Sequence, residues 1–172
     1  MNPVVGPTKP GDIPYEVRMQ CYDAILDEYP KNHVLLNTLP LAMRMGGPRE
    51  AMLHALIRKN HGATHFIIGR DHAGPGSDSN GNDIYGPYEA RDFLEEHKEE
   101  VGITPVPFEE MVYIEKEKKY FPRSAVPEGV KPLKISGTDV RRMLKTGEPI
   151  PEWFSPPRVV KILREANKNQ QQ

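Results

Sequence analysis

The sequence predicts an α/β protein with a mostly parallel sheet, and two observations support this prediction. Segments rich in β-branched and apolar residues alternate with segments of helical periodicity along the chain. Residues 64–68, with the sequence Thr-His-Phe-Ile-Ile, form a buried strand in this prediction and open directly into a glycine-rich polar stretch at residues 69–76. Because ligands of open α/β sheets bind at the carboxyl ends of the strands, we expect the functional site in this stretch.

The first part of the chain is expected to contain one helix and one strand. Residues 1–12 are rich in proline and glycine and should be extended, with Asp12 as the N-cap of a helix over residues 15–29. Pro30 should end that helix. Residues 33–39 are apolar and partly β-branched, which predicts a second buried strand.

The middle of the chain predicts a strand, helix, strand unit with a right-handed crossover. Its helix covers residues 49–60, begins after Gly-Gly-Pro and should turn Ala51, Leu53, Leu56 and Ile57 inward. The strand at residues 64–68 completes the unit. Residues 74–86 are rich in Gly, Ser, Asn and Asp, and we expect a mobile loop over the site.

The remainder should form a helix, two short strands interrupted by prolines, and two further helices. These are expected at residues 87–100, 103–108, 111–114, 139–145 and 156–166.

The composition limits the class of protein and its partners. With 172 residues, of which 37% are hydrophobic, the chain can bury one core and supports one domain. The formal net charge of −1 provides no overall field for nucleic acid or an anionic membrane. The single cysteine, Cys21, excludes an intramolecular disulfide framework. Since there is no apolar N-terminal segment or membrane-length apolar run, we expect a cytoplasmic protein without nucleic-acid or membrane partners.

The glycine-rich stretch contains the residue types that suit an anionic nucleotide. Gly69 lets backbone amides approach a ligand closely, and Arg70 supplies a planar cationic fork. Asp71 can accept hydrogen bonds from ribose hydroxyls, while His72 can donate to phosphate or orient a neighbour. The alternative is a surface turn in which Arg70 and Asp71 pair with each other.

This stretch, Gly-Arg-Asp-His-Ala-Gly-Pro-Gly, and the Asp-Ile-Tyr-Gly-Pro-Tyr block at residues 83–88 closely resemble the nucleotide-binding segment of ATP sulfurylases, the sulfate adenylyltransferases. Three further blocks agree with that family in the same order, at residues 41–51, 135–138 and 151–155. The resemblance implies a Rossmann-like nucleotidyltransferase fold whose sheet is incomplete at its N-terminal strand. Residues 1–134 would be a partial adenylyltransferase catalytic domain, and residues 135–172 the C-terminal helical part of the same domain.

The resemblance also implies roles for individual residues. The backbone of Ala73 would contact sulfate, and Met111 corresponds to a family position whose backbone lies near the adenine. A plain core methionine is an equally open interpretation of Met111. The remaining contacts to ATP or the adenylyl product would come from Gly69, Arg70, Asp71 and His72.

Two weaker phosphate sites are predicted outside this stretch. Ser136 and Thr138 begin a helix whose N-terminus can bind an anion, and Arg141 can add a bidentate contact. This block looks like a phosphate-gripping element of the wider adenylyltransferase superfamily, although an ordinary N-cap uses the same residue types. Arg44 follows the predicted strand at 33–39 and could reach the same crevice as Arg70, or pair with Glu50.

We expect no metal site and no covalently bound cofactor. His61 and His65 have a spacing found in zinc helices, but Gly62 ends the predicted helix between them. Mg²⁺ would enter with ATP as the substrate Mg-ATP.

The function implied by the resemblance is that of a sulfate adenylyltransferase, which makes adenosine 5′-phosphosulfate (APS) and pyrophosphate from ATP and sulfate during sulfate assimilation or activation. The family's Gln-x-Arg-Asn-Pro and His-x-x-His motifs are absent from these 172 residues, so no catalytic residue is identified. Activity is therefore expected only if another chain supplies the missing strand and those groups. The expected partner chains are another sulfurylase chain or further copies of this chain in a homo-oligomer. The alternatives are a non-catalytic nucleotide-binding or assembly fragment of that enzyme, and an adenylyltransferase acting on another small molecule.

Overall fold

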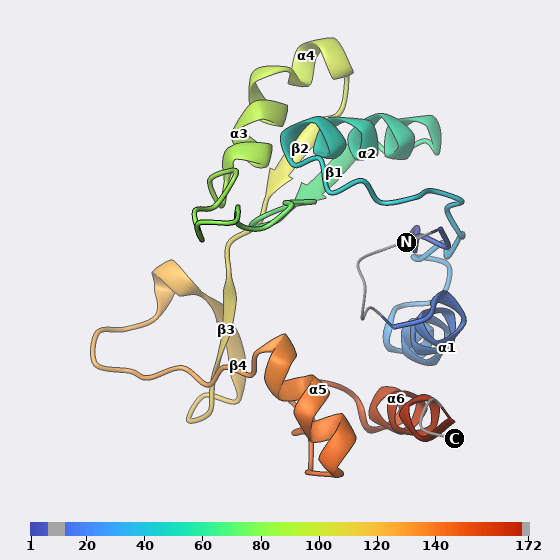
Figure 1. Ribbon diagram of the computed structural model, residues 1–172, viewed down its shortest axis with the longest axis vertical. Coiled ribbons are helices and arrows are strands. Elements are labelled where there is room, and N and C mark those ends of the chain that lie inside the picture. The colour runs from blue at the N-terminus through green and yellow to red at the C-terminus, as the bar shows by residue number, and fades with distance from the viewer. Residues whose placement is uncertain (7–12, 170–172) are drawn as a thin grey trace. The chain divides into compact units, whose positions relative to one another are not determined.

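The computed structural model describes residues 1–6 and 13–169, which fall into two compact units (Figure 1). The sheet unit comprises Arg44–Val112 and Phe121–Glu128. The terminal unit comprises Met1–Met43, Tyr113–Tyr120 and Gly129–Gln172. The predicted boundary at residue 134 lies between two parts of one domain, and it stays a prediction.

The sheet unit contains a small parallel sheet, which agrees with the predicted α/β class. Strand β1 (His65–Ile68) pairs in parallel with β2 (Thr104–Pro107), with His65 opposite Thr104 and Ile68 opposite Pro107. The chain between the strands forms α3 (Glu89–Glu96) and α4 (Lys98–Val101), which correspond to the single helix predicted at residues 87–100. In Figure 1, β1 and β2 lie side by side, and α2 (Pro48–Asn60), which packs against β1, crosses them.

The core of the sheet unit lies between the helices and one face of the strands. Phe66 and Ile68 of β1 point into it, whereas Ile67 between them is 61% exposed, so β1 is buried on one face only. The other core residues come from α2 and the α3–β2 region: Ala51, Ala55, Ala90, Leu94, Val101 and Ile103.

Helix α2 was predicted at the right position but with the wrong inward face. Ala51 is buried as expected, yet Leu53 and Leu56 are exposed. The buried face instead carries Glu50 and His54, which are 4% and 5% exposed. A pattern based on apolar residues misses this face because its polar side chains are buried in contact with each other.

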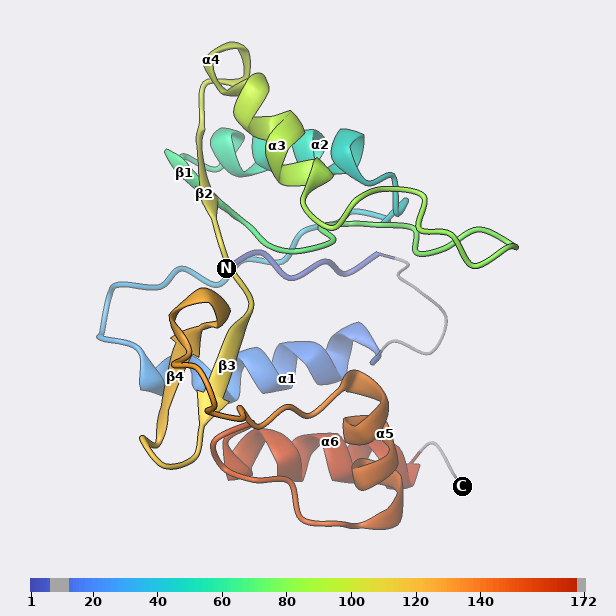
Figure 2. The same cartoon turned by 90° about the vertical axis from the view of Figure 1, so that its left-hand side faces the viewer.

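The terminal unit is helical. Helix α1 (Tyr15–Ile25) continues into the 3₁₀ turn η1 (Leu26–Glu28) and packs against α6 (Pro157–Asn169), while α5 (Gly137–Thr146) packs on α6 (Figure 2). These helices confirm the elements predicted at residues 15–29, 139–145 and 156–166. Asp12, the predicted N-cap, lies outside the described residues, and Pro14 holds the N-cap position of α1.

The predicted strand at residues 33–39 is wrong. Leu39 forms an isolated parallel bridge with Val4, and the Asn37 N–H donates to the Met1 carbonyl. Leu35 is 77% exposed. The Leu39 N–H also donates to the Pro3 carbonyl, so the segment pairs with the first residues of the chain, but only one isolated bridge forms and no regular strand results. The predicted strand, helix, strand unit is replaced by one that runs from β1 through α3 and α4 to β2.

A second two-stranded sheet joins β3 (Met111–Ile114) to β4 (Lys119–Pro122), followed by the 3₁₀ turn η2 (Arg123–Ala125). Strand β3 was predicted, but β4 was not, because its charged and proline-containing sequence has a weak strand signal. Within the described part of the chain, no helix has the length and apolar character needed to cross a membrane.

Candidate functional site

The predicted turn begins where β1 ends, at the carboxyl edge of the parallel sheet. Asp71 and Ala73 have φ angles of 51° and 53°, in the left-handed region that such residues seldom occupy. Two backbone hydrogen bonds maintain this conformation. The Asp71 N–H donates to the Pro87 carbonyl at 2.7 Å, and the Gly47 N–H donates to the Ala73 carbonyl at 2.9 Å. The turn is therefore attached to the loop before α2 and to the segment before α3.

Side chains packed against glycines shape the same region. A Cβ built at Gly74 would lie 1.8 Å from Asp71 Oδ1, so the carboxyl group of Asp71 covers the Gly74 backbone. At Gly47, where φ is 57°, an added Cβ would lie 2.5 Å from the Tyr85 ring. These two glycines are required by the fold itself. A small cavity of about 50 Å³ remains beside the turn, lined in part by Arg70, Asp71 and Tyr85.

Gly69 and Arg70 are not closely packed in the way that Gly47 and Gly74 are. A Cβ added at Gly69 would meet nothing within 4 Å. The Arg70 side chain is exposed, and no ion pair or hydrogen bond to Asp71 is present among the residues the structure describes. The predicted alternative of an Arg70–Asp71 pair is thus not observed. An open backbone beside an accessible guanidinium is suited to receiving an anion.

A buried polar array lies behind the turn. Both carboxylate oxygens of Glu50 accept backbone hydrogen bonds at 2.8 Å, Oε1 from Arg44 and Oε2 from Gly46. His54 Nε2 lies 3.5 Å from Glu50 Oε1, and His54 Nδ1 lies 3.1 Å from His72 Nε2. The His72 ring also packs edge-on against Phe66, with ring centroids 5.4 Å apart. The array thereby connects the loop before α2 to the turn after β1.

Burial makes both histidines of this array weak bases. The pKa of His72 is lowered from its ordinary value of 6.5 to about 4, mainly by burial. The neighbouring His54 and Arg58 contribute to this lowering, whereas Glu50 opposes it. The pKa of His54 is also lowered, mainly by burial. Both imidazoles are therefore neutral at pH 7.

The other predicted residues of the sheet unit are accessible. Arg44 is exposed, and its contact with Glu50 is made by its backbone N–H. The structure thus places Glu50 under the Arg44 backbone and leaves the guanidinium toward solvent. Met111 on β3 is 39% exposed, unlike the adjacent Val112, so Met111 is not a core residue.

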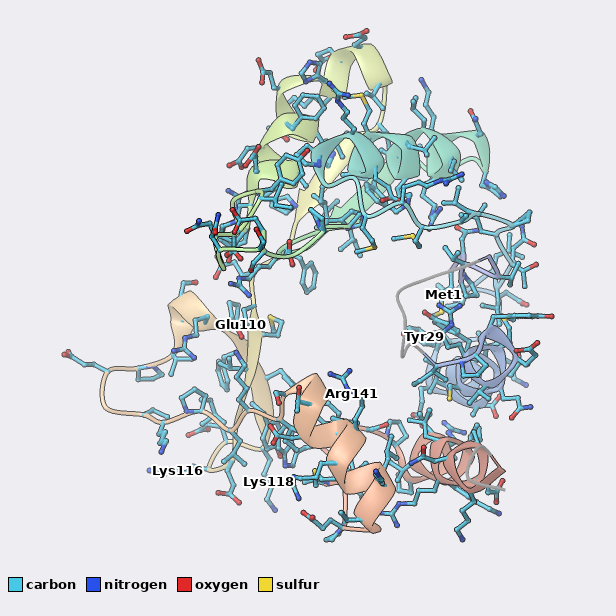
Figure 3. All side chains as sticks on the ribbon, viewed as in Figure 1. Met1, Tyr29, Glu110, Lys116, Lys118 and Arg141 are labelled. Atoms are coloured by element: carbon cyan, nitrogen blue, oxygen red, sulfur yellow. The ribbon has the colours of Figure 1, made fainter. Side chains whose placement is uncertain are left out.

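The second predicted phosphate site, at the start of α5, lies in the terminal unit. Ser136 and Asp139 form a capping box: the Asp139 N–H donates to Ser136 Oγ, and the Ser136 N–H donates to the Asp139 carboxylate, each at 3.1 Å. Arg141 projects from the N-terminal half of α5 (Figure 3), where it donates to Thr138 Oγ1 at 3.3 Å. Ser136 is thus engaged in the N-cap that the sequence offered as an alternative.

The predicted non-ligands His61 and His65 each have a local partner. His61 Nδ1 is 2.9 Å from the Ile57 carbonyl oxygen, and His65 Nδ1 is 2.9 Å from Thr64 Oγ1. In the described residues, no group of three or more His, Cys, Asp or Glu side chains could hold a metal ion.

Three residues that build this site had no such role in the sequence analysis: Glu50 was named only as a possible partner of Arg44, Tyr85 only as part of the block at 83–88, and His54 not at all. A signal was present for two of them, since Glu50 and His54 are four residues apart on a predicted helix and so share one face. The contact of Tyr85 with Gly47 depends on the path of an irregular loop and has no sequence signal.

Comparison with known proteins assigns the chain to a family. A sequence profile named ATP-sulfurylase matches residues 1–166. The chain belongs to the ATP-sulfurylase family. The resemblance drawn from the sequence motifs is thereby confirmed.

The relatives of this ATP-sulfurylase chain are much longer. Sulfate adenylyltransferase from Yarrowia lipolytica is 59% identical over 167 residues, which cover 97% of this chain and 29% of that protein. Sulfate adenylyltransferase from Phaeosphaeria nodorum is 56% identical over 173 residues, covering 99% and 30% respectively. A solved structure, described as the hexameric APS kinase from Thiobacillus denitrificans, matches with a TM-score of 0.74 and 26% identity over 96% of this chain and 30% of that one. The chain thus spans about 30% of the length of these relatives.

Proposed function

We propose that this chain provides the adenine-nucleotide-binding part of a sulfate adenylyltransferase, the activity for which its relatives are named. The observation that supports the proposal most strongly is Gly69 beside Arg70 at the end of β1. The fold leaves open space above Gly69, so packing within this chain gives no reason for a glycine there. A phosphate lying against the backbone does give one, because a side chain at this position would prevent its approach.

The roles proposed for the turn follow from the exposure and chemistry of its groups. Arg70 would pair with the phosphates, and Asp71 would accept hydrogen bonds from the ribose. His72 would support the turn from its buried side. The Ala73 backbone would meet sulfate, and Met111 would flank the adenine. We further propose that the α/β unit is a Rossmann-like nucleotidyltransferase fold.

In the proposed reaction, a sulfate oxygen attacks the α-phosphorus of Mg-ATP. The bond from that phosphorus to the bridging oxygen of the β-phosphate breaks, so that APS forms and pyrophosphate leaves. All the reactants are anions, so the main task of the protein is to hold them in line and offset their repulsion. The exposed guanidiniums of Arg70 and Arg44 are suited to this task.

The start of α5 is proposed as a second phosphate contact. Its side-chain donors are Thr138 and Arg141, while Ser136 keeps the helix N-terminus capped. This contact should be weaker than that of the turn, because the Asp139 carboxylate already lies at the same helix end.

Thermal protection by Mg-ATP tests the nucleotide-binding part of the proposal. At a ligand concentration of about 100 times Kd, a site specific to the folded state adds roughly 2.7 kcal/mol of stability. We expect Mg-ATP or APS to raise the melting temperature of the chain and Arg70→Ala to abolish that rise. The matched control is Arg49→Ala, which removes another exposed arginine of the sheet unit and should retain the protection. Equal protection of the Arg70 variant would refute its assignment.

A second candidate is a nucleotide-binding or assembly component without turnover of its own. It is favoured by the length comparison, since the chain spans about 30% of the relatives named for the activity. A pyrophosphate-release assay with Mg-ATP and sulfate separates the two candidates. Turnover by the purified chain would reject the second one, whereas nucleotide protection without turnover would support it.

A further inference from the structure

Glu50 and His54, which form a polar array with the half-buried His72, are too buried to bind a ligand themselves. Glu50 and His54 are 4% and 5% exposed, and both lie on the inner face of α2. The array nevertheless reaches both segments that present the candidate site. Glu50 holds the backbone of Arg44 and Gly46, and His54 contacts His72 in the turn after β1.

The surroundings of His54 determine where its proton lies. His54 Nε2 is buried and makes no hydrogen bond to any residue that the structure describes, and it lies 3.5 Å from Glu50 Oε1, so a proton on Nε2 faces a carboxylate. With the proton there, Nδ1 of the neutral ring is a lone-pair acceptor. The hydrogen bond of 3.1 Å between the rings must then be donated by His72 Nε2–H.

The opposite arrangement is disfavoured on electrostatic grounds. If His54 Nδ1 donated to His72 Nε2, the lone pair of His54 Nε2 would face the carboxylate oxygen at 3.5 Å. Two acceptors would then oppose each other in a buried site, where an unmet hydrogen bond is costly. The first arrangement instead turns the Nε2 proton of His54 toward the Glu50 carboxylate and leaves Nδ1 to accept from His72.

We propose that Glu50 and His54 are positioning residues that hold His72 as its Nε2–H tautomer and thereby fix the turn that presents Gly69 and Arg70. In this arrangement His72 uses its one N–H inside the protein and offers no second donor to a phosphate at neutral pH. Glu50 acts through His54 and through its hydrogen bonds to the loop before α2. The loop before α2 and the turn after β1 are thereby held in a fixed position relative to each other. The effect on nucleotide affinity rests on the proposed function, whereas the tautomer does not.

The first test is the ¹⁵N spectrum of histidine-labelled full-length chain without nucleotide. Pyrrole-type and pyridine-type ring nitrogens have separate ¹⁵N shifts, so the spectrum reports the His72 tautomer directly. We expect the Nε2–H form of His72 in the unmodified chain. The Nδ1–H form, or a mixture of the two, would overturn the proposal.

Two substitutions at His54 extend the test. His54→Asn places an amide oxygen near the former Nδ1 position and can still accept from His72, whereas His54→Phe fills the space without an acceptor. We expect His54→Asn to keep the Nε2–H form and His54→Phe to lose it. His61→Gln, which alters an exposed histidine at the end of the same helix, should leave the His72 signals unchanged.

Affinity for Mg-ATP, measured by calorimetry, supplies the functional readout. Loss of the supporting hydrogen bond in His54→Phe should weaken binding about tenfold, while His54→Asn should stay within about twofold of the unmodified chain. If His54→Phe does not fold, Glu50→Gln removes one acceptor from the array and should weaken binding in the same direction. Unchanged affinity in a variant that has lost the Nε2–H form would overturn the positioning role. Absence of any binding by the unmodified chain would instead reject the proposed function, and the spectrum would still decide the tautomer.

Discussion

The turn after β1 and the N-terminus of α5 were both predicted to bind phosphate, but they use their polar groups differently. In the turn, the groups that hold the conformation are buried or backbone groups, and Arg70 is left exposed. At α5, Ser136 and Asp139 satisfy each other in a capping box, and Arg141 contacts Thr138. In the turn, different groups therefore hold the conformation and face a ligand. At α5, the polar groups that could bind phosphate are mostly hydrogen-bonded to one another.

This difference shows how to judge a polar motif. Ser and Thr at a helix start are selected for capping whether or not a ligand binds there. Gly69 and Arg70 have no comparable internal use, because the space above Gly69 is empty and Arg70 has no pairing with its neighbour. A motif is a stronger indication of function where the surrounding structure gives its residues no other task.

The largest effect should come from removing the scaffold of the turn. Glu50→Ala leaves the Arg44 and Gly46 amides without their acceptor and should lower the free energy of unfolding by about 3 kcal/mol. Glu89→Ala is the matched control, since Glu89 accepts from the Gly86 N–H at an exposed position and should cost less than about 1 kcal/mol. Urea denaturation measures both. Equal losses would contradict the distinction between scaffold and surface.

A second effect should appear in acid. The pKa of His72 is lowered from 6.5 to about 4, so the unfolded chain binds more protons between these values. The stability that depends on neutral His72 is complete above pH 6.5 and is lost as pH falls toward 4. After allowance for partial exposure, we expect a loss of about 2 kcal/mol. His72→Phe should flatten this part of the stability curve, and a curve of unchanged slope in the variant would contradict the assignment.

Substitutions at two glycines of this region should distinguish an effect on folding stability from an effect on nucleotide binding. Gly47→Ala forces a positive φ on alanine and places its Cβ against the Tyr85 ring, which should cost roughly 2 kcal/mol of stability. Gly69→Ala should change stability by less than about 0.5 kcal/mol, because its Cβ enters open space. Thermal denaturation of both variants provides the measurement. A large loss in the Gly69 variant would remove the main support for the proposed function.

The smallest effect is expected at α5. Ser136→Ala removes the side-chain half of the capping box and should cost about 1 kcal/mol of stability. Arg141→Ala should leave stability within about 0.5 kcal/mol, because Arg141 donates an exposed hydrogen bond to Thr138. Its Mg-ATP affinity should fall by less than that of Arg70→Ala. A larger fall would make α5 the principal phosphate site and reverse the comparison.

The sequence predicted the elements whose signals are local. The helix at 49–60 follows a Gly-Gly-Pro start, and the strand at 64–68 has strong β-branched character, so both were found. Residues 33–39 have similar composition, but they pair with residues 1–5 only through separate hydrogen bonds and one isolated bridge, which composition does not report. Strand identity therefore depended on contacts distant in the sequence.

The candidate site was predicted as a motif but not as a structure. The turn at residues 69–74 was located by its resemblance to ATP sulfurylases. The burial of Glu50 and His54 was missed because a polar residue on a helix is ordinarily assigned to the solvent face. Their burial follows from mutual contact and from backbone donors in an irregular loop, neither of which has a periodic signal.

Calorimetric titration of Mg-ATP into the unmodified chain and into Gly69→Ala tests the central claim most directly. The claim is that the open backbone after β1 receives the phosphates of a nucleotide. We expect the unmodified chain to bind and the variant to unfold at the same temperature while binding at least about tenfold more weakly. Equal affinity in the two chains would contradict the claim.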